Sequence, residues 1–135
     1  MTKFLLLMNH DGGKAETTMH DWDEADRQAH LDHLTASLDR MRERGELVEV
    51  QGLTWPKHAK VVRAASVSAP VITDGPYAEA KEILAGYTLI DVESEERALE
   101  IAAEQSSAPG PGGLPLEQPI EVRRLMGSDA DFWDI

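Results

Sequence analysis

The sequence predicts a single α+β domain with an antiparallel sheet, and three observations support this prediction. Short apolar or alternating runs, typical of strands, are separated by two longer segments in which apolar residues recur at helical spacing. The length of 135 residues suits one domain with a sizeable hydrophobic core. Hydrophobic residues make up 41% of the chain and charged residues 28%, which is the balance of an ordinary globular protein.

The first part of the chain reads as strand, helix and strand. The apolar run KFLLLM at residues 3–8 suits a strand that is buried on both faces. Apolar side chains then recur every three to five residues, which predicts a helix over residues 21–44. Asp21 or Asp23 is a suitable N-cap for this helix, and Gly45 is a suitable end. The alternating segment ELVEVQG at residues 46–52 predicts the next strand.

The second part reads as a hairpin, a short helix, a strand, a longer helix and a closing strand. We expect these elements at residues 60–75, 78–84, 86–92, 95–105 and 120–126. Ser94 is the expected N-cap of the longer helix, and the residues before the closing strand are a loop by composition. The chain is therefore expected to be one domain, residues 1–126, followed by an acidic tail with two aromatic residues, residues 127–135.

Without the hairpin, the order of the elements is βαββαβ, the ferredoxin-like plan, in which two helices cover one face of the sheet. The first strand does not alternate as such a sheet requires, because Leu5 and Leu7 lie opposite Phe4 and Leu6. The strand at residues 86–92 has the same two-sided character. With no third long helix expected, the sheet of a second copy is the simplest cover, so we predict a homodimer packed sheet to sheet.

Composition excludes several classes of function. The chain has no cysteine, which excludes a disulfide framework, a thiolate nucleophile and a Cys-ligated metal. Its net charge of -12 opposes binding to a phosphate backbone, so no nucleic-acid partner is expected. The apolar run at the start is too short for a signal peptide, and no run is long enough to cross a membrane. We therefore expect a cytoplasmic protein without a membrane partner.

Histidines and carboxylates must carry any acid–base or metal chemistry in a chain without cysteine. The segment DRQAHLDH places Asp26, His30 and His33 near one stripe of the first helix. This spacing is compatible with an acid–base dyad or a metal site, but a hydrogen-bonded histidine at the edge of the core is the favoured interpretation of His30. His33 lies on the polar side, where a structural role is expected. No phosphate-binding loop and no hydrolase elbow is present, and we expect no cofactor.

The most distinctive stretch is TDGPYAEAKEILAGYTLIDVESEERALEIAAE at residues 73–104, followed by PIEVRRLM at residues 119–126. It resembles the DGPF subgroup of the YCII-related family, whose pattern is roughly D-G-P-[FY]-A-E-x-K-E-x-x-x-G-[FY]-x-L-I. The positions that fit are Asp74, Gly75, Pro76, Tyr77, Ala78, Glu79, Lys81, Glu82, Gly86, Tyr87, Leu89 and Ile90. The resemblance implies a ferredoxin-like protomer that forms a dimeric α+β barrel.

The resemblance also implies a candidate site. A histidine shared in the YCII branch has His30 as its counterpart, whereas that branch's aspartate has none in AAEQSSAPGPGG. Asp74 of the DGP turn is therefore the candidate replacement. Our hypothesis is a small molecule bound between helices and sheet, with His30 as general acid or base and Asp74 as its partner. The expected substrate-binding residues are Tyr77, Glu79, Lys81 and Arg123.

The alternative hypothesis is a non-catalytic binding or regulatory module. Some members of the family are encoded beside extracytoplasmic-function sigma factors, which implies protein contacts, given the acidity of this chain. The expected contact surfaces are the hairpin at residues 60–73 and the acidic tail. An exposed apolar patch on the hairpin would favour this alternative, and a closed polar pocket around His30 and Asp74 would favour the enzyme.

Overall fold

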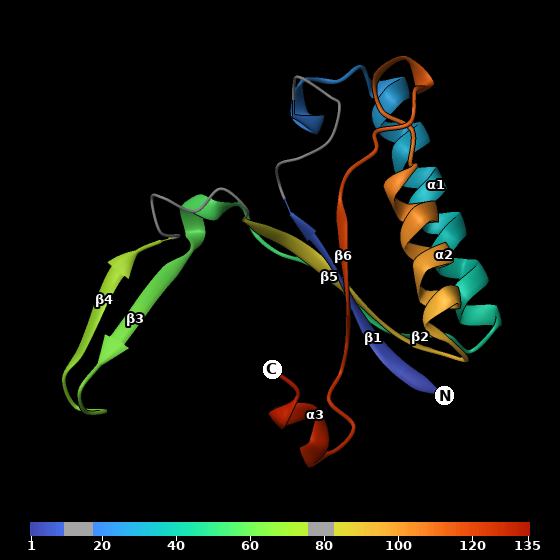
Figure 1. Cartoon of the computed structure of the whole chain (residues 1–135). Coiled ribbons are helices and arrows are strands. Elements are labelled where there is room, and N and C mark those ends of the chain that lie inside the picture. The colour runs from blue at the N-terminus through green and yellow to red at the C-terminus, as the bar shows by residue number, and fades with distance from the viewer. Residues whose placement is uncertain (10–17, 76–82) are drawn as a thin grey trace.

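The computed structural model describes residues 1–9, 18–75 and 83–135, drawn as ribbons in Figure 1. Over these residues the elements are β1 (Thr2–Asn9), α1 (Glu24–Glu43), β2 (Leu47–Gly52), β3 (Lys60–Ala64), β4 (Pro70–Asp74), β5 (Leu84–Val92), α2 (Glu95–Ser106), β6 (Ile120–Arg124) and α3 (Asp129–Trp133). Three short 3-10 turns lie at Met19–Asp21, Pro56–His58 and Pro111–Gly113. The predicted α+β class is confirmed.

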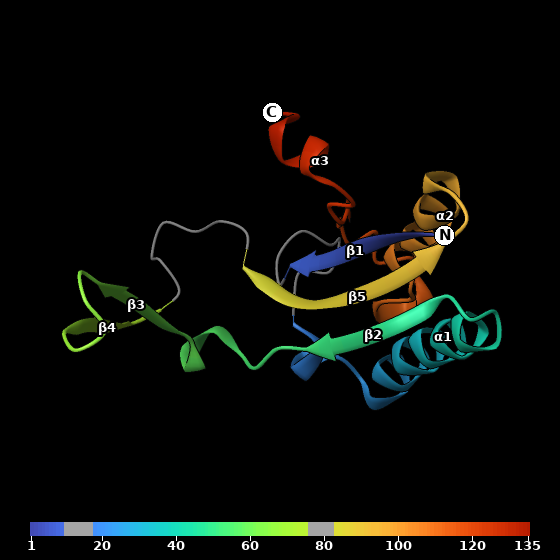
Figure 2. The same ribbon diagram turned by 90° about the horizontal axis from the view of Figure 1, so that it is seen from below.

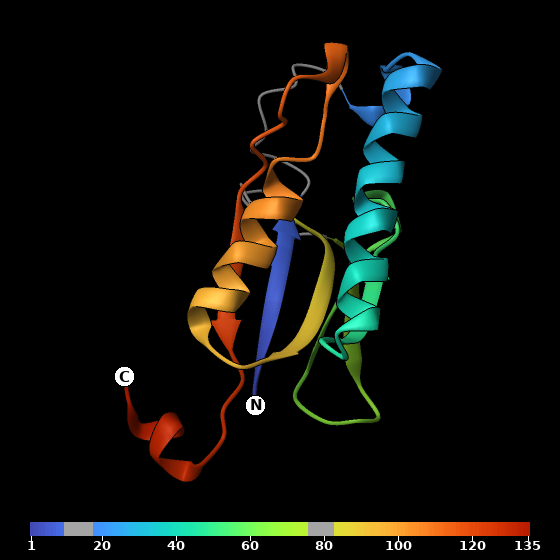
Figure 3. The ribbon, with the colours of Figure 1, turned by 90° about the vertical axis from the view of Figure 1, so that its right-hand side faces the viewer.

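The sheet has four strands in the order β2-β5-β1-β6, and every neighbouring pair is antiparallel. Both long helices, α1 and α2, cover the same face of this sheet (Figures 1 and 3). The strands β3 and β4 form a separate two-stranded sheet that extends beyond the end of the main sheet (Figure 2). The other face of the main sheet, which the helices leave uncovered, is called the open face below.

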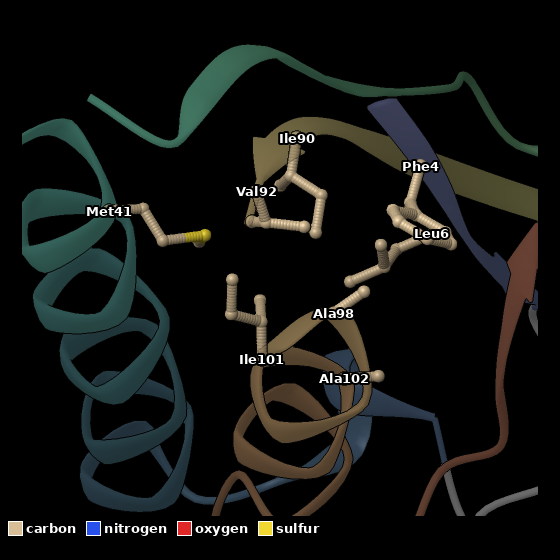
Figure 4. Packing of buried hydrophobic residues seen from close by; sticks show 8 residues of the cluster. All are labelled: Phe4, Leu6, Met41, Ile90, Val92, Ala98, Ile101 and Ala102. Carbon is tan, nitrogen blue, oxygen red and sulfur yellow. The ribbon is translucent and has the colours of Figure 1, made fainter. Parts of the chain in front are cut away.

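The core lies between the sheet and the helices, and the strand alternation determines its members. Phe4 and Leu6 of β1 and Ile90 and Val92 of β5 point toward the helices and are at most 2% exposed. They pack against Met41 of α1 and against three residues of α2 (Figure 4). The α2 residues are Ala98, Ile101 and Ala102.

The open face carries the other half of the two-sided strands. Leu5 pairs with Leu89, and Leu7 pairs with Tyr87, in the antiparallel register of β1 and β5. Their neighbours in each strand point into the core, so these four side chains point away from the helices. The two-sided character expected from the sequence is therefore present.

The ends of the two long helices follow the expected capping rules. Ser94 accepts a hydrogen bond from the Arg97 backbone N–H and so caps α2. Gly45 has a φ of +69° after the end of α1, a left-handed conformation that suits glycine. The Glu46 N–H donates to the Met41 carbonyl across this turn, which gives the last turn of α1 a partner.

Two boundaries differ from the sequence-based expectation. β5 begins at Leu84, which contradicts the C-terminal end of the helix expected over residues 78–84; residues 78–82 lie outside the described residues. The tail contains the short helix α3, which was not expected. Asp131 accepts hydrogen bonds from the Arg124 guanidinium and from the Gly127 N–H, and these contacts hold the turn that leads into α3.

Within the described segments, no helix is long and apolar enough to span a membrane.

Candidate functional site

A cavity of about 200 Å³ lies between α1 and the sheet, near the sheet end where β2 finishes and β5 starts. The described residues that line it are Leu6, Met8, Leu34, Leu38, Val50, Gln51, Gly52, Ala85, Gly86, Tyr87, Thr88 and Gln105. None of these residues carries a charged side chain. The cavity is therefore a largely apolar cleft between a helix and the sheet.

Small residues on the strands make room for the cavity. Gly52 of β2 and Gly86 of β5 are register partners, and Ala85 lies beside them. At this level no large side chain from either strand fills the space between sheet and helix. Leu34 and Leu38, one helical turn apart on α1, form the opposite wall.

A buried polar pair provides the hydrogen-bonding groups of the cavity. The Gln105 side-chain amide donates to the Thr88 hydroxyl oxygen over 3.2 Å, and both residues are less than a tenth exposed. Because the Thr88 oxygen accepts this bond, its own O–H remains a donor. A few polar groups in a largely apolar cavity are the usual arrangement for orienting a small ligand, and Thr88 and Gln105 are the buried ones here.

His30 lies on α1, one turn before Leu34, and is 4% exposed. Its Nδ1 is 3.0 Å from the Pro109 carbonyl oxygen, and its ring meets the edge of Trp22 at 5.6 Å between centroids. A carbonyl only accepts, so Nδ1 carries the proton and Nε2 does not. Burial lowers the pKa of His30 and outweighs the opposite effect of the Pro109 hydrogen bond, so the ring is neutral near pH 7.

His33 has a similar structural partner. Its Nε2 is 2.8 Å from the Glu104 carbonyl oxygen near the end of α2. His30 and His33 therefore connect α1 to α2 and to the loop that follows it, through two backbone carbonyls. In the part of the chain that the structure describes, no group of three His, Asp or Glu side chains is arranged to hold a metal ion.

We expect replacement of His30 by Gln to flatten the dependence of stability on pH. The folded-state pKa of His30 is lowered, so its contribution is present above the unfolded-state value of about 6.5 and is lost as the pH falls below it. Urea unfolding at pH values from 8 to 5 should show a smaller loss of unfolding free energy for His30→Gln than for the wild type. His58→Gln, at an exposed position, is the control and should keep the wild-type slope. Equal slopes in all three proteins would contradict the expectation.

The other predicted site residues lie elsewhere or outside the described residues. The Asp74 carboxylate is 87% exposed and pairs with the Lys60 ammonium at 2.5 Å within the hairpin, without a contact to His30. Arg123 pairs with Leu5 in the sheet register and so belongs to the open face, not to the cavity. Tyr77, Glu79 and Lys81 lie outside the described residues, and their role in binding stays a prediction.

The sequence reasoning missed Thr88 and Gln105. Each had a signal in the pattern, because each is a polar residue at an apolar position. Thr88 lies on the same buried face of β5 as Ile90 and Val92. Gln105 lies one turn after Ile101 on the buried stripe of α2. A polar residue on a buried stripe needs a partner, and here the two are partners for each other.

Comparisons with known proteins agree with the resemblance seen in the sequence. The model of the YCII-related domain matches residues 2–112. An uncharacterized protein of Rhizobium meliloti (strain 1021) is 32% identical over 110 residues, which cover 82% of this chain and 84% of the relative. The domain match includes the strands and helices that form the cavity, and it ends before β6 and α3.

Proposed function

The chain belongs to the YCII-related domain family, and from this premise we propose that it binds a small neutral molecule in the cavity between α1 and the sheet. The observation that supports the proposal is the buried Thr88–Gln105 pair, which offers hydrogen bonds inside an apolar space. An ion would be desolvated there without compensation from the described lining residues, which favours a neutral ligand.

The size of the cavity narrows the class of ligand. A cavity of about 150 Å³ holds benzene in another protein, and the present volume of about 200 Å³ is moderately larger. The expected ligand is therefore a single ring or a short chain, with one carbonyl or hydroxyl group directed at Thr88. An apolar ligand body would contact Leu34 and Leu38.

Acid–base catalysis by His30 is the second part of the proposal. His30 does not line the cavity but lies on α1 one turn before the lining residue Leu34, so this part rests on the state of its ring. Its neutral ring with an unprotonated Nε2 has the form that a general base needs near pH 7. The Pro109 carbonyl fixes the tautomer, which is the orienting role that the sequence assigned to Asp74. Turnover that survives His30→Gln would assign the chemistry to another group. Ligand binding without any turnover by the wild type would limit the function to binding.

Finer assignments complete the proposal. The strand order β6-β1-β5-β2 supports a ferredoxin-like plan with β3 and β4 as an inserted hairpin. The DGP segment supports the DGPF subgroup within the family. The apolar open face supports a homodimer packed sheet to sheet, of the dimeric α+β barrel type. Domain limits of 1–126 and 127–135, a cytoplasmic location and the absence of nucleic-acid and membrane partners stay predictions.

Ligand binding can be tested with a library of neutral compounds of about 6 to 12 non-hydrogen atoms, since binding to the native state raises its melting temperature. Compounds that bind should lose about 3- to 10-fold in affinity with Thr88→Val, because one neutral hydrogen bond is removed. Leu34→Phe should abolish binding by filling the cavity. Thr54→Val, at an exposed position, is the control and should bind as the wild type does. Equal affinity in all four proteins, or no binder in the library, would contradict the proposal.

A second candidate function is favoured by one observation. Several large apolar residues of the hairpin are exposed, among them Val62, Val71 and Ile72. This pattern suits a module that acts through protein contacts, for example with a sigma-factor system. The test uses the variant Val62→Thr/Ile72→Thr. If this variant no longer co-purifies with a protein that the wild type binds, and its small-molecule affinity is unchanged, the second candidate function is supported.

A further inference from the structure

The hairpin of β3 and β4 packs on little of its own protomer. Within the described residues its two strands pair only with each other, and it extends away from the main sheet (Figures 1 and 2). At its base, the Gly75 N–H donates to the Ala59 carbonyl. An isolated two-stranded hairpin is marginally stable in water and usually needs another surface to pack against.

One face of the hairpin is suited to such packing. Val62 pairs with Ile72, and Ala64 pairs with Pro70, so these four residues form one continuous apolar face. Val62 is 59% and Ile72 is 61% exposed. The Lys60–Asp74 ion pair lies at the base of the same face. Val71 belongs to the other face, opposite Arg63.

The hairpin extends on the side of the main sheet opposite α1 and α2, which is the side of the open face (Figure 1). The hairpin, which carries the exposed Val62 and Ile72, and the open face, on which Leu5 and Leu89 are half-buried, therefore lie on one side of the protomer. A second copy of the chain docked on the open face would lie next to the hairpin, so one partner could cover both.

The charges of the open face fit a second copy. Lys3 and Arg123 lie on β1 and β6, whereas Glu49 and Asp91 lie on β2 and β5, although Glu121 also lies on β6. A two-fold axis parallel to the strands places the β1–β6 side of one copy over the β2–β5 side of the other. Basic groups then approach acidic groups.

An additional element enlarges the interface that the open face can form. Four strands spaced about 4.8 Å apart, each of roughly seven residues, give a flat sheet area of roughly 450 Å². A stable interface typically buries about 800 Å² of accessible surface on each partner, a quantity that the relief of the side chains makes larger than the flat area. The hairpin is an exposed apolar element on the same side and would add to the buried surface.

We propose that the hairpin of β3 and β4 is an intersubunit arm, whose Val62–Ile72 face packs on a second copy of the chain docked at the open face. The proposal rests on the homodimer proposed above and adds a specific element to its interface. It also gives the inserted hairpin a reason for its apolar composition, because each arm would be stabilised by the other protomer.

The test compares dimer dissociation constants, measured by analytical ultracentrifugation, for the wild type and three variants. Val62→Thr/Ile72→Thr keeps the β-branched shape but removes apolar surface, and should weaken the dimer by about 10- to 100-fold. Val71→Thr makes the same change on the other face of the hairpin and should change the constant by less than about 3-fold. Leu89→Arg, on the open face, should give monomers. Circular dichroism of the dilute monomers checks that all variants fold.

The outcomes separate the arm from the dimer. If Leu89→Arg dissociates the dimer while Val62→Thr/Ile72→Thr leaves it intact, the arm is wrong and the sheet-to-sheet dimer stands. An equal effect of the two hairpin variants would also overturn the arm, because the effect would not depend on the Val62–Ile72 face. A wild type that stays monomeric at about 100 μM would overturn both. If only the binding of a different protein depends on Val62 and Ile72, that protein occupies the hairpin and the second copy does not.

Discussion

Replacing Glu46 with Gln is expected to lower the free energy of unfolding by about 2–4 kcal/mol, because the largely buried Arg97 guanidinium loses its bidentate carboxylate and keeps only the exposed Glu100. Glu46 follows the end of α1, and Arg97 lies in the first turn of α2. The two side chains are 10% and 18% exposed, and the Arg97 Nε and a terminal guanidinium nitrogen donate to the two carboxylate oxygens at 2.8 and 2.9 Å. This bidentate pair joins the start of β2 to α2.

The same pair predicts a loss of stability in acid. The hydrogen bonds from Arg97 lower the pKa of Glu46 and outweigh the opposite effect of burial. A carboxyl group with a lowered folded-state pKa stabilises the fold above its unfolded-state pKa of about 4.3, and this contribution is lost as the pH falls through the folded-state value. The unfolding free energy of the wild type, measured with urea, should therefore fall below about pH 4.3. Glu46→Gln should lose less unfolding free energy over the same pH range.

Glu100 provides a matched control for the charge change. Its carboxylate also pairs with Arg97, at 3.1 Å, but its side chain is 67% exposed. An exposed ion pair contributes little, so Glu100→Gln should cost less than about 1 kcal/mol. If both substitutions had the same effect, the loss would reflect net charge and not the buried contact between Glu46 and Arg97.

Much of the fold could be predicted because its signals are local. The apolar run of β1, the helical spacing in α1 and the serine before α2 each reflect interactions within a few residues of the chain. The two faces of β1 and β5 could be predicted for the same reason, since alternation assigns each side chain to a face. The helix α3 was missed because it depends on the contact between Arg124 and Asp131 and not on a helical pattern.

The candidate site was less predictable because its contacts join distant parts of the chain. The position of His30 at the edge of the core was expected, but its partner is a carbonyl 79 residues away, in a loop without a regular pattern. The expected pairing of His30 with Asp74 came from a family resemblance and not from a contact in the sequence. Asp74 instead pairs with Lys60, its register neighbour in the hairpin.

Gly86, the second glycine of the DGP pattern, affects both the fold and the cavity. It is buried in β5 and lines the cavity. A Cβ at this position would lie 2.8 Å from the Gln51 carbonyl oxygen and 3.3 Å from the Gly52 Cα. Both neighbours are backbone atoms of β2, which cannot move without separating the two strands. Gly86→Ala is therefore expected to cost about 1–3 kcal/mol of unfolding free energy.

Gly52, the register partner of Gly86, allows the direct comparison. A Cβ at Gly52 would meet no atom within 4 Å, and its φ is not in the left-handed region, so Gly52→Ala should be neutral or stabilise by about 0.5 kcal/mol. Urea unfolding of the two variants should thus give effects of different size or opposite sign for the same chemical change in one pair of strands. Equal effects would mean that the close approach of β2 and β5 does not require glycine. The predicted difference would place the requirement at Gly86, where the strands approach each other beside the cavity.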